Sequence, residues 1–283
     1  MNLDNMRRYG VEVEFYSRLN MNSLGEKIYR ETGIEVHRVN YSNRDTDLWR
    51  LKPDASLSSV TRNGENYYPM ELVTPILHGE EDLQKLKRIV QIIDLDGYVN
   101  KQTGLHVHVD IADATVEELR RFMAYAGKYE NAINTILPPS RRQSRWAKNH
   151  LPFGVNLKDY YTDINRQSES KRDLVENNYF NGRGTRYLKW NFENYWRTGT
   201  VENRAHSGTT DCDKIENWVR LIQGIIHRTF KAKCTMWTKK NATAQTYDIK
   251  HMVWDLYKND AISADVRKFY FKRYKVLNND VRR

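Results

Sequence analysis

The stretch that decides the fold is GLHVHVD, residues 104–110. On a β-strand successive side chains point to opposite faces, so the two histidines and the aspartate share one face, and the leucine and the two valines share the other. An apolar face that packs on a core, below a face with imidazoles and a carboxylate, is suited to hold metal ligands rigidly. Two hydrogen-bonded histidines on a half-buried strand explain the same pattern equally well.

A second segment, Arg8 to Tyr16, has the same alternating design. It predicts a strand whose apolar residues face a core and whose Glu12 and Glu14 face the other side. Glutamate is disfavoured in strands, and like charges on one face repel each other. A half-exposed strand that happens to carry two glutamates is the alternative, but a divalent cation between the carboxylates makes the pair more tolerable.

Two further predicted strands carry ionisable residues within apolar sequence. Tyr67 to Thr74 holds Glu71 between Met70 and Leu72, and an unpaired glutamate would be costly to bury there. Glu71 is therefore either an edge residue or a ligand. Thr200 to His206 is the third alternating row, in which Glu202, Arg204 and His206 share one face.

The remaining pattern alternates helices with short strands. Apolar periodicity predicts helices over Ser23–Thr32, Glu80–Leu95, Thr115–Leu137 and Asp213–Lys233, followed by two helices within Tyr247–Leu277. Ser23 is the predicted cap of the first helix and Gly33 its stop. Capping boxes are predicted for Thr115 with Glu118 and for Asp213 with Glu216. Further strands are predicted at Ile34–Val39 and Tyr187–Glu193, and within Trp49–Leu57 a strand runs into a turn at Pro53-Asp54.

The segment from Pro138 to Thr185 is polar, basic and nearly without periodicity, apart from a short helix expected around Ser170 to Glu176. Long ordered loops in compact domains are usually lids or binding loops. We interpret the segment as a cover over the site, and a disordered surface insertion is the alternative.

Composition limits the class of protein. The chain has 283 residues, of which 39% are hydrophobic and 29% charged, so it should form one large domain or two small ones. It has no apolar run of the roughly 18 residues that a membrane span needs, and Met1 to Arg8 lack the apolar core of a signal peptide. The two cysteines, Cys212 and Cys234, do not form a metal pair by spacing, so a reducing, cytoplasmic location is expected.

The net charge of +10 suits a polyanionic partner or phosphorylated substrates. Basic residues cluster at Arg141–Lys148 and at Lys268–Arg283.

The strands aim one set of ionisable residues at a common surface: Glu12, Glu14, Glu71, His106, His108, Glu202 and Arg204. Carboxylates with an imidazole favour Mg²⁺ or Mn²⁺, and four carboxylates carry enough charge for two cations. Two divalent ions beside an arginine are what phosphoryl transfer from ATP needs, because the metals neutralise the phosphate oxygens and the guanidinium stabilises the developing charge.

Six motifs in order resemble a known family. They are YGVEVEF (9–15), PDASL (53–57), ELVTP (71–75), GLHVHVD (104–110), PSRR (139–142) and TVENRAHSGT (200–209). Together they resemble the amidoligase family of the glutamine synthetase-like, carboxylate–amine ligase superfamily, over about residues 7 to 225. Each motif alone is weak, whereas the ordered set is specific.

The resemblance implies an α+β fold, in which a curved antiparallel β-sheet forms a funnel-like active site and helices pack on its outer face, as in the glutamine synthetase catalytic domain. Residues 1–235 would form this domain, with 138–185 as a lid-like insertion. Residues 236–283 would be a C-terminal helical extension with a basic tail. ATP and two or more Mg²⁺ or Mn²⁺ ions would be the cofactors.

Roles also follow from the resemblance. The metal ligands would be Glu12, Glu14, Glu71, His106 and Glu202, although His108 could replace His106 as ligand. The other histidine, here taken as His108, would contact substrate or phosphate. Arg204 would contact the transferred phosphate, and Arg141 and Arg142 would hold the phosphates of ATP.

Two positions depart from the family pattern. Asn203 stands where a large apolar residue is usual, and it needs a partner if it points into the core. Ala55 stands in a turn that is elsewhere Asp-Gly-Ser. Asp54 would bind or deprotonate the amine substrate, but a turn-capping role explains this aspartate at least as well.

The implied activity is that of an ATP-dependent carbon–nitrogen ligase with ATP-grasp-like chemistry, which joins an amine to an amino-acid carboxylate such as that of glutamate through an acyl phosphate. A phosphagen-type guanidino kinase on a related scaffold is one alternative. A double-stranded β-helix hydrolase or oxygenase also uses His-x-His, but it needs a chain dominated by strands. A nucleic-acid-binding protein that uses the basic loop and tail is the alternative from another class.

Overall fold

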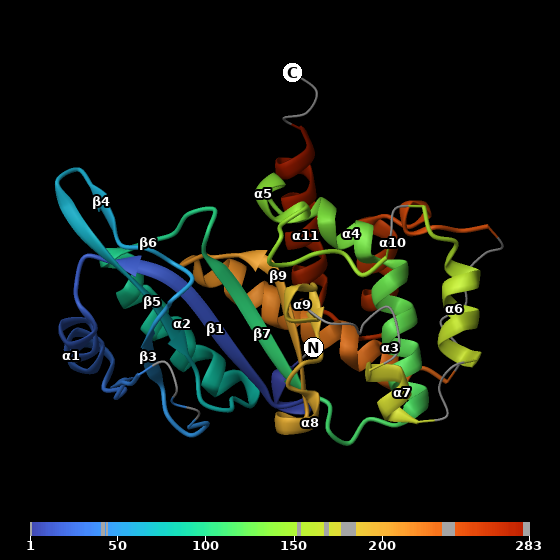
Figure 1. The fold of residues 1–283 in the computed structure, drawn as a ribbon, viewed down its shortest axis with the longest axis horizontal. Coiled ribbons are helices and arrows are strands. Elements are labelled where there is room, and N and C mark those ends of the chain that lie inside the picture. The colour runs from blue at the N-terminus through green and yellow to red at the C-terminus, as the bar shows by residue number, and fades with distance from the viewer. Residues whose placement is uncertain are drawn as a thin grey trace. The chain divides into compact units, whose positions relative to one another are not determined.

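The computed structural model describes residues 2–40, 43, 45–151, 154–166, 170–176, 185–233 and 241–279. The chain divides into two compact units (Figure 1). We call residues 2–109 and 206–219 the sheet unit, and residues 110–205 and 220–283 the helical unit. No helix among the described residues is long and apolar enough to cross a membrane.

The sheet unit is built on an open sheet with the strand order β2-β3-β5-β1-β7, in which β4 also pairs with β5 and β6 with β1. Its strands are β1 (Tyr9–Ser17), β2 (His37–Arg38), β3 (Arg50–Pro53), β4 (Val60–Arg62), β5 (Glu65–Val73), β6 (Gly97–Tyr98) and β7 (Gly104–Asp110). All pairs are antiparallel except β2 with β3. A mixed α/β protein with a mostly antiparallel sheet is therefore confirmed, and the funnel stays a prediction.

The register decides which side chains share a face of this sheet. Glu14 lies opposite Glu71 across β1 and β5, and Glu12 lies opposite His106 across β1 and β7. Directly opposed residues point to the same face, so this face carries charge. The other face carries apolar residues that are all fully buried: Val13, Leu51, Leu72, Leu105 and Val107.

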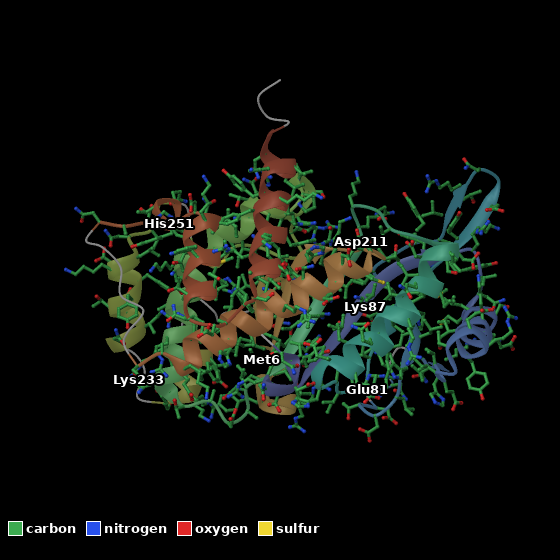
Figure 2. The ribbon with its side chains drawn as sticks, turned by 180° about the vertical axis from the view of Figure 1, so that it is seen from behind. Met6, Glu81, Lys87, Asp211, Lys233 and His251 are labelled. Carbon is green, nitrogen blue, oxygen red and sulfur yellow. The ribbon has the colours of Figure 1, made fainter. Side chains whose placement is uncertain are left out.

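Two helices complete the core of the sheet unit, α1 (Met21–Thr32) and α2 (Gly79–Asp96), after the short turn η1 (Leu3–Asn5). The predicted apolar stripe of α2 is fully buried, from Leu83 to Ile93. Figure 2 shows α2, which carries the labelled Glu81 and Lys87, lying over β1. The apolar stripe and the apolar face of the sheet thus form one core.

The predicted cap of α1 is wrong by three residues, although the predicted stop is right. The side chain of Asn20 accepts the hydrogen bond from the Ser23 backbone N–H at 3.0 Å, so Asn20 caps the helix. Asparagine competes with serine as a cap, and both precede the same apolar pattern. Gly33 ends the helix with a φ of +70°, a conformation that glycine adopts without strain.

The helical unit contains helices of 4 to 16 residues and, within the described ranges, the antiparallel strand pair of β8 (Trp190–Asn191) with β9 (Thr200–Ser207). Its other elements are α3 (Val116–Lys128), α4 (Glu130–Thr135), α5 (Pro139–Arg142), α6 (Leu157–Arg166), α7 (Lys171–Glu176), η2 (Thr185–Tyr187), α8 (Tyr195–Thr198), η3 (Ala244–Thr246), α10 (Ile249–Lys258) and α11 (Ala264–Asn279). The helix α9 (Cys212–Lys231) begins in the sheet unit and ends in the helical unit.

The single helix predicted over 115–137 is wrong, because the chain leaves the helical conformation at Tyr129. The capping box of Thr115 and Glu118 is confirmed, but α3 ends at Lys128 and α4 follows. The Tyr129 ring is buried between Tyr125, at 4.6 Å between ring centroids, and Tyr247, at 5.8 Å. This tertiary packing overrides a continuous helical pattern.

The segment 138–185 contains more helix than predicted. The short helix expected near Ser170–Glu176 is confirmed as α7, but α6 was missed. Leu157, Tyr160 and Ile164 form a buried stripe on α6 that charged residues obscure in the sequence. Residues 152–153, 167–169 and 177–184 lie outside the described residues, so part of the predicted lid does too.

The predicted start of α9 is also wrong. The carboxylate of Asp211 accepts the hydrogen bond from the Lys214 backbone N–H at 3.1 Å, which places the cap before Asp213. Glu216, predicted to complete a capping box, pairs instead with Lys87 of α2 at 2.5 Å (Nζ to Oε2). The two helices predicted near the C-terminus are confirmed as α10 and α11, and the predicted domain boundary at residue 235 stays a prediction.

Two leucines of α2, one buried and one exposed, allow a test of the core of the sheet unit. Leu86 is fully buried, whereas Leu95 is 64% exposed. We expect Leu86→Ala to lower the free energy of unfolding by about 2–5 kcal/mol, because it leaves a cavity. Leu95→Ala should change it by less than about 0.5 kcal/mol. Urea unfolding followed by circular dichroism measures both, and equal losses would contradict this core.

Candidate active site

The sheet unit brings five of the predicted site residues together on β1, β5 and β7, which lie side by side (Figure 1). Glu12 stands between the two histidines: its Oε2 lies 3.2 Å from His106 Nδ1, and its Oε1 lies 3.2 Å from His108 Nε2. His106 Nε2 also lies 3.5 Å from Glu14 Oε1. One carboxylate therefore orients both imidazoles.

Backbone contacts fix the second glutamate. Glu14 Oε2 accepts a hydrogen bond of 2.6 Å from the backbone N–H of Gly104, the first residue of β7. His106 is almost fully buried, with 3% of its surface exposed. The alternating sequence of β1 and β7 positions these groups, and the antiparallel register brings them into contact.

Glu12 and Glu71 differ in their electrostatics. Burial alone would raise the pKa of Glu12, but the charge of His108 and hydrogen bonds from both imidazoles bring that pKa well below its usual range. Burial raises the pKa of Glu71 well above its usual range, and the negative charges of Glu12, Glu14 and Asp54 raise it further. Lys52 offsets only part of this effect on the Glu71 pKa.

Three of these residues have the spacing of a metal site. One ligand atom each from Glu12, Glu71 and His106 lie within 4.8 Å of one another. Two carboxylates and one imidazole suit Mn²⁺ or Mg²⁺. A divalent cation would also relieve the repulsion that raises the pKa of Glu71, so the donor set and its charge both fit such an ion.

Asp54 follows β3 at the same face and uses its two oxygens differently. Oδ1 accepts a hydrogen bond of 2.8 Å from the Ser56 backbone N–H, which is the turn-capping role. Oδ2 is shielded from solvent and has no hydrogen-bond partner among the described residues. Burial raises the pKa of Tyr16, and the charge of Asp54 contributes to that rise. A cap and a ligand-binding role are therefore compatible at Asp54.

In the helical unit, Glu202 and Arg204 lie on one face of β9 and pair with each other. Arg204 Nη1 donates to Glu202 Oε1 at 2.5 Å, and Asn191 Nδ2 donates to Glu202 Oε2 at 2.7 Å. Glu202 is 3% exposed. Asn191 lies opposite Glu202 in the β8–β9 register, so the strand pair supplies this second donor.

The two arginines predicted to hold ATP phosphates contact backbone carbonyls in the structure. Arg141 is buried and donates from Nη2 to the carbonyl oxygen of Arg204 at 2.7 Å and from Nε to that of Ala205 at 3.4 Å. Arg142 instead donates to the carbonyl oxygens of Leu137 and Leu277, at 3.0 and 3.2 Å. Arg141 therefore supports the strand that carries Arg204, whereas Arg142 ties α5 to α11.

Asn203, the departure from the family pattern, is fully buried. Its Oδ1 accepts a hydrogen bond of 3.1 Å from the Ala205 backbone N–H, which gives it one partner. Its Nδ2 has none among the described residues.

Sequence reasoning missed a buried polar network in the helical unit. Lys189 is 1% exposed, and its Nζ donates to the carbonyl oxygen of Arg142 at 3.2 Å and to Asn149. Burial lowers the pKa of Lys189 to about 8. Glu130 accepts from the backbone N–H groups of His150 and Leu151. The sequence signal that could have indicated this network is Lys189 itself, a lysine within a predicted strand of mostly apolar residues.

The sequence of the chain matches a known protein family over the region that contains these residues. A family model described as "Putative amidoligase enzyme" matches residues 5–226, most of the chain. The chain belongs to this family. The match spans every predicted site residue from Glu12 to Arg204, so the resemblance inferred from the six motifs is confirmed. The family supports an enzyme of the ligase type. A search of curated proteins found no match.

Glu71→Gln tests the charge imbalance of the cluster. Because the pKa of Glu71 is raised in the fold, the folded protein holds this proton more tightly than the unfolded chain, and stability falls as pH rises above the ordinary pKa of glutamate. Without metal at pH 7, the variant should be more stable by about 1 kcal/mol, or roughly 2–4 °C in Tm. The gain should vanish near pH 4.

The same variant should bind Mn²⁺ at least tenfold more weakly by calorimetry, because it lacks one ligand charge. Glu65→Gln is the control, since Glu65 lies on the same strand with 55% of its side chain exposed. It should change neither quantity. A Glu71→Gln protein that is less stable at pH 7 yet binds Mn²⁺ normally would contradict the assignment.

Proposed function

We propose that the protein is an ATP-dependent carboxylate–amine ligase that forms an amide through an acyl phosphate, with an amino acid such as glutamate as the carboxylate donor. The observation that carries this proposal is the cluster of Glu12, Glu71 and His106, whose ligand atoms lie within 4.8 Å of one another in a member of the amidoligase family.

The cluster accounts for the metal requirement of such a reaction. Glu12, Glu71 and His106 would hold one Mg²⁺ or Mn²⁺ ion. Glu14 and Glu202 stay predicted metal ligands. Bound divalent ions supply neutralisation of the ATP phosphate oxygens and orientation of the γ-phosphate.

Arg204 is the residue that we expect to stabilise negative charge on the transferred phosphoryl group. Its guanidinium is already oriented by Glu202, so little side-chain entropy remains to be lost. Arg141 holds the backbone of Arg204 through two carbonyl oxygens. Arg141 and Arg142 are also proposed to bind the phosphates of ATP.

The proposed reaction has two steps. A carboxylate oxygen of the substrate attacks the γ-phosphorus of ATP, the bond from that phosphorus to the β–γ bridging oxygen breaks, and an acyl phosphate and ADP form. The amine then attacks the acyl carbon, phosphate leaves, and the amine loses one proton to give the amide. Water would hydrolyse the acyl phosphate, so the segment 138–185 is proposed to exclude it.

Asp54 is proposed to bind the amine substrate, and His108 is proposed to contact substrate or phosphate. Asp54 Oδ2 is buried without a partner among the described residues, so an ammonium group would supply the missing donor. His108 contacts Glu12 and is expected to contact substrate or phosphate as the second histidine of β7.

Substitution of the charged pair on β9 tests the phosphoryl-transfer step. We expect Arg204→Ala and Glu202→Ala to lower phosphate release from ATP by about 100-fold or more in mixtures of amino acids and amines. The first removes the guanidinium that would stabilise negative charge, and the second removes the carboxylate that orients this guanidinium. Product mass separates an amide from a phosphorylated guanidine, the product of a phosphagen-type kinase. Equal phosphate release by wild type and both variants would remove the proposal.

Matched controls for this test lie nearby in the sequence. Glu193 and Arg197 are both exposed. Glu193→Ala and Arg197→Ala remove the same charges, and they should leave phosphate release unchanged.

Asp54→Asn isolates the amine site, because asparagine keeps the oxygen that caps the turn and replaces the buried oxygen with an amide group. We expect the KM for the amine to rise roughly tenfold to a hundredfold with little change in the KM for ATP. Asp45 caps a turn in the same way, with 2.8 Å from Oδ1 to the Asp47 backbone N, so Asp45→Asn is the control. A change in the KM for ATP alone would contradict the role of Asp54.

A further inference from the structure

The helical unit exposes a tryptophan on α10 that is surrounded by cations. Trp254 is 49% exposed, and its ring lies 5.9 Å from that of Tyr257. Lys258 Nζ lies 4.9 Å from the centre of the Trp254 ring. The Arg267 guanidinium, from α11, lies 5.1 Å from the Trp254 ring and 4.1 Å from the Tyr257 ring. Figure 2 labels His251 on the same helix.

The same arrangement occurs a second time, in a different part of the helical unit. Trp146 is 39% exposed, and its ring lies 5.4 Å from that of Tyr187. The Arg145 guanidinium lies 4.7 Å from the Trp146 ring, and the Arg186 guanidinium lies 5.7 Å from the Tyr187 ring. Each place thus combines an exposed tryptophan, a second ring and two cations, and we call the two places the Trp254 and Trp146 stations.

The charges around both stations favour an anionic ligand. Lys258, Arg267, Arg145 and Arg186 make no ion pair with a carboxylate of the described residues, and the acidic residue of α10 and that of α11 each pair with another cation. Asp255 pairs with Arg228, and Asp265 pairs with Lys268. The Trp146 station lies in a stretch without any acidic residue between Glu130 and Asp159.

Rings and cations in this combination suit a ligand that carries both exposed base faces and phosphates. Unpaired bases stack on aromatic side chains, and the phosphates between them are attracted to lysine and arginine. A duplex hides its base faces, and a simple polyanion has none to stack. We propose that the Trp254 and Trp146 stations bind single-stranded nucleic acid, a function that goes beyond the ligase reaction and does not depend on it.

Fluorescence anisotropy of a labelled 20-nucleotide oligo(dT) with the full chain tests this proposal. We expect binding that weakens by tenfold or more between 50 and 200 mM salt, and a duplex of equal length that binds more weakly. Trp254→Ala and Trp146→Ala should each weaken oligo(dT) binding about tenfold, and Trp254→Phe should retain most of it, because a ring is kept.

Trp196→Ala is the matched control, since Trp196 is 55% exposed and no cation of the described residues lies over its ring. It should bind like wild type, as should Glu71→Gln, which separates this function from the ligase site. The proposal is overturned if oligo(dT) does not bind, if the tryptophan variants bind it as tightly as wild type, or if inorganic polyphosphate at equal phosphate concentration displaces it with no difference between wild type and variants. Circular dichroism of each variant confirms folding.

Discussion

The constraint that the sheet unit must satisfy is the close approach of carboxylates across β1 and β5. The register places Glu14 opposite Glu71, and the alternation of β1 places Glu12 on the same face. Like charges opposed in a sheet are destabilising, so the apolar face must compensate. It does so with a fully buried layer, Val13, Leu72 and Leu105 among others, over the buried stripe of α2. The core beneath the charged face therefore stabilises it, in addition to the contacts of Glu12 and Glu14 within that face.

Local patterns were sufficient to predict much of this arrangement. Alternation along Glu12 and Glu14, and along His106 and His108, correctly assigned each side chain to a face, because strand parity depends only on neighbouring residues. The pairing of Glu12 with His106 and of Glu14 with Glu71 joins strands far apart in sequence. No local pattern contains that register, so the sequence predicted a common surface and only the fold showed the contacts.

The helical unit was harder to predict, because its decisive contacts connect side chains to a distant backbone. The role of Arg141 toward ATP phosphates stays a prediction, and its guanidinium donates to the carbonyl oxygens of Arg204 and Ala205, a contact that no sequence pattern indicated. Lys189 lies in an apolar strand pattern that gives no sign of its contacts with Asn149 and the Arg142 carbonyl. Composition identifies a basic segment, but it cannot separate an arginine that supports a strand from one that meets a ligand.

The contrast between Glu12 and Glu71 connects the fold with the chemistry. Two imidazoles surround Glu12 and keep its pKa low, so its negative charge is compensated within the protein. Glu71 faces Glu12, Glu14 and Asp54, and Lys52 offsets their effect on its pKa only in part. The cluster therefore has more negative charge than its own cations balance. A buried excess of this kind costs stability in the isolated protein, and it is what gives a cluster affinity for a divalent cation. The repulsion between carboxylates on this face and the proposed metal site are in this sense the same feature.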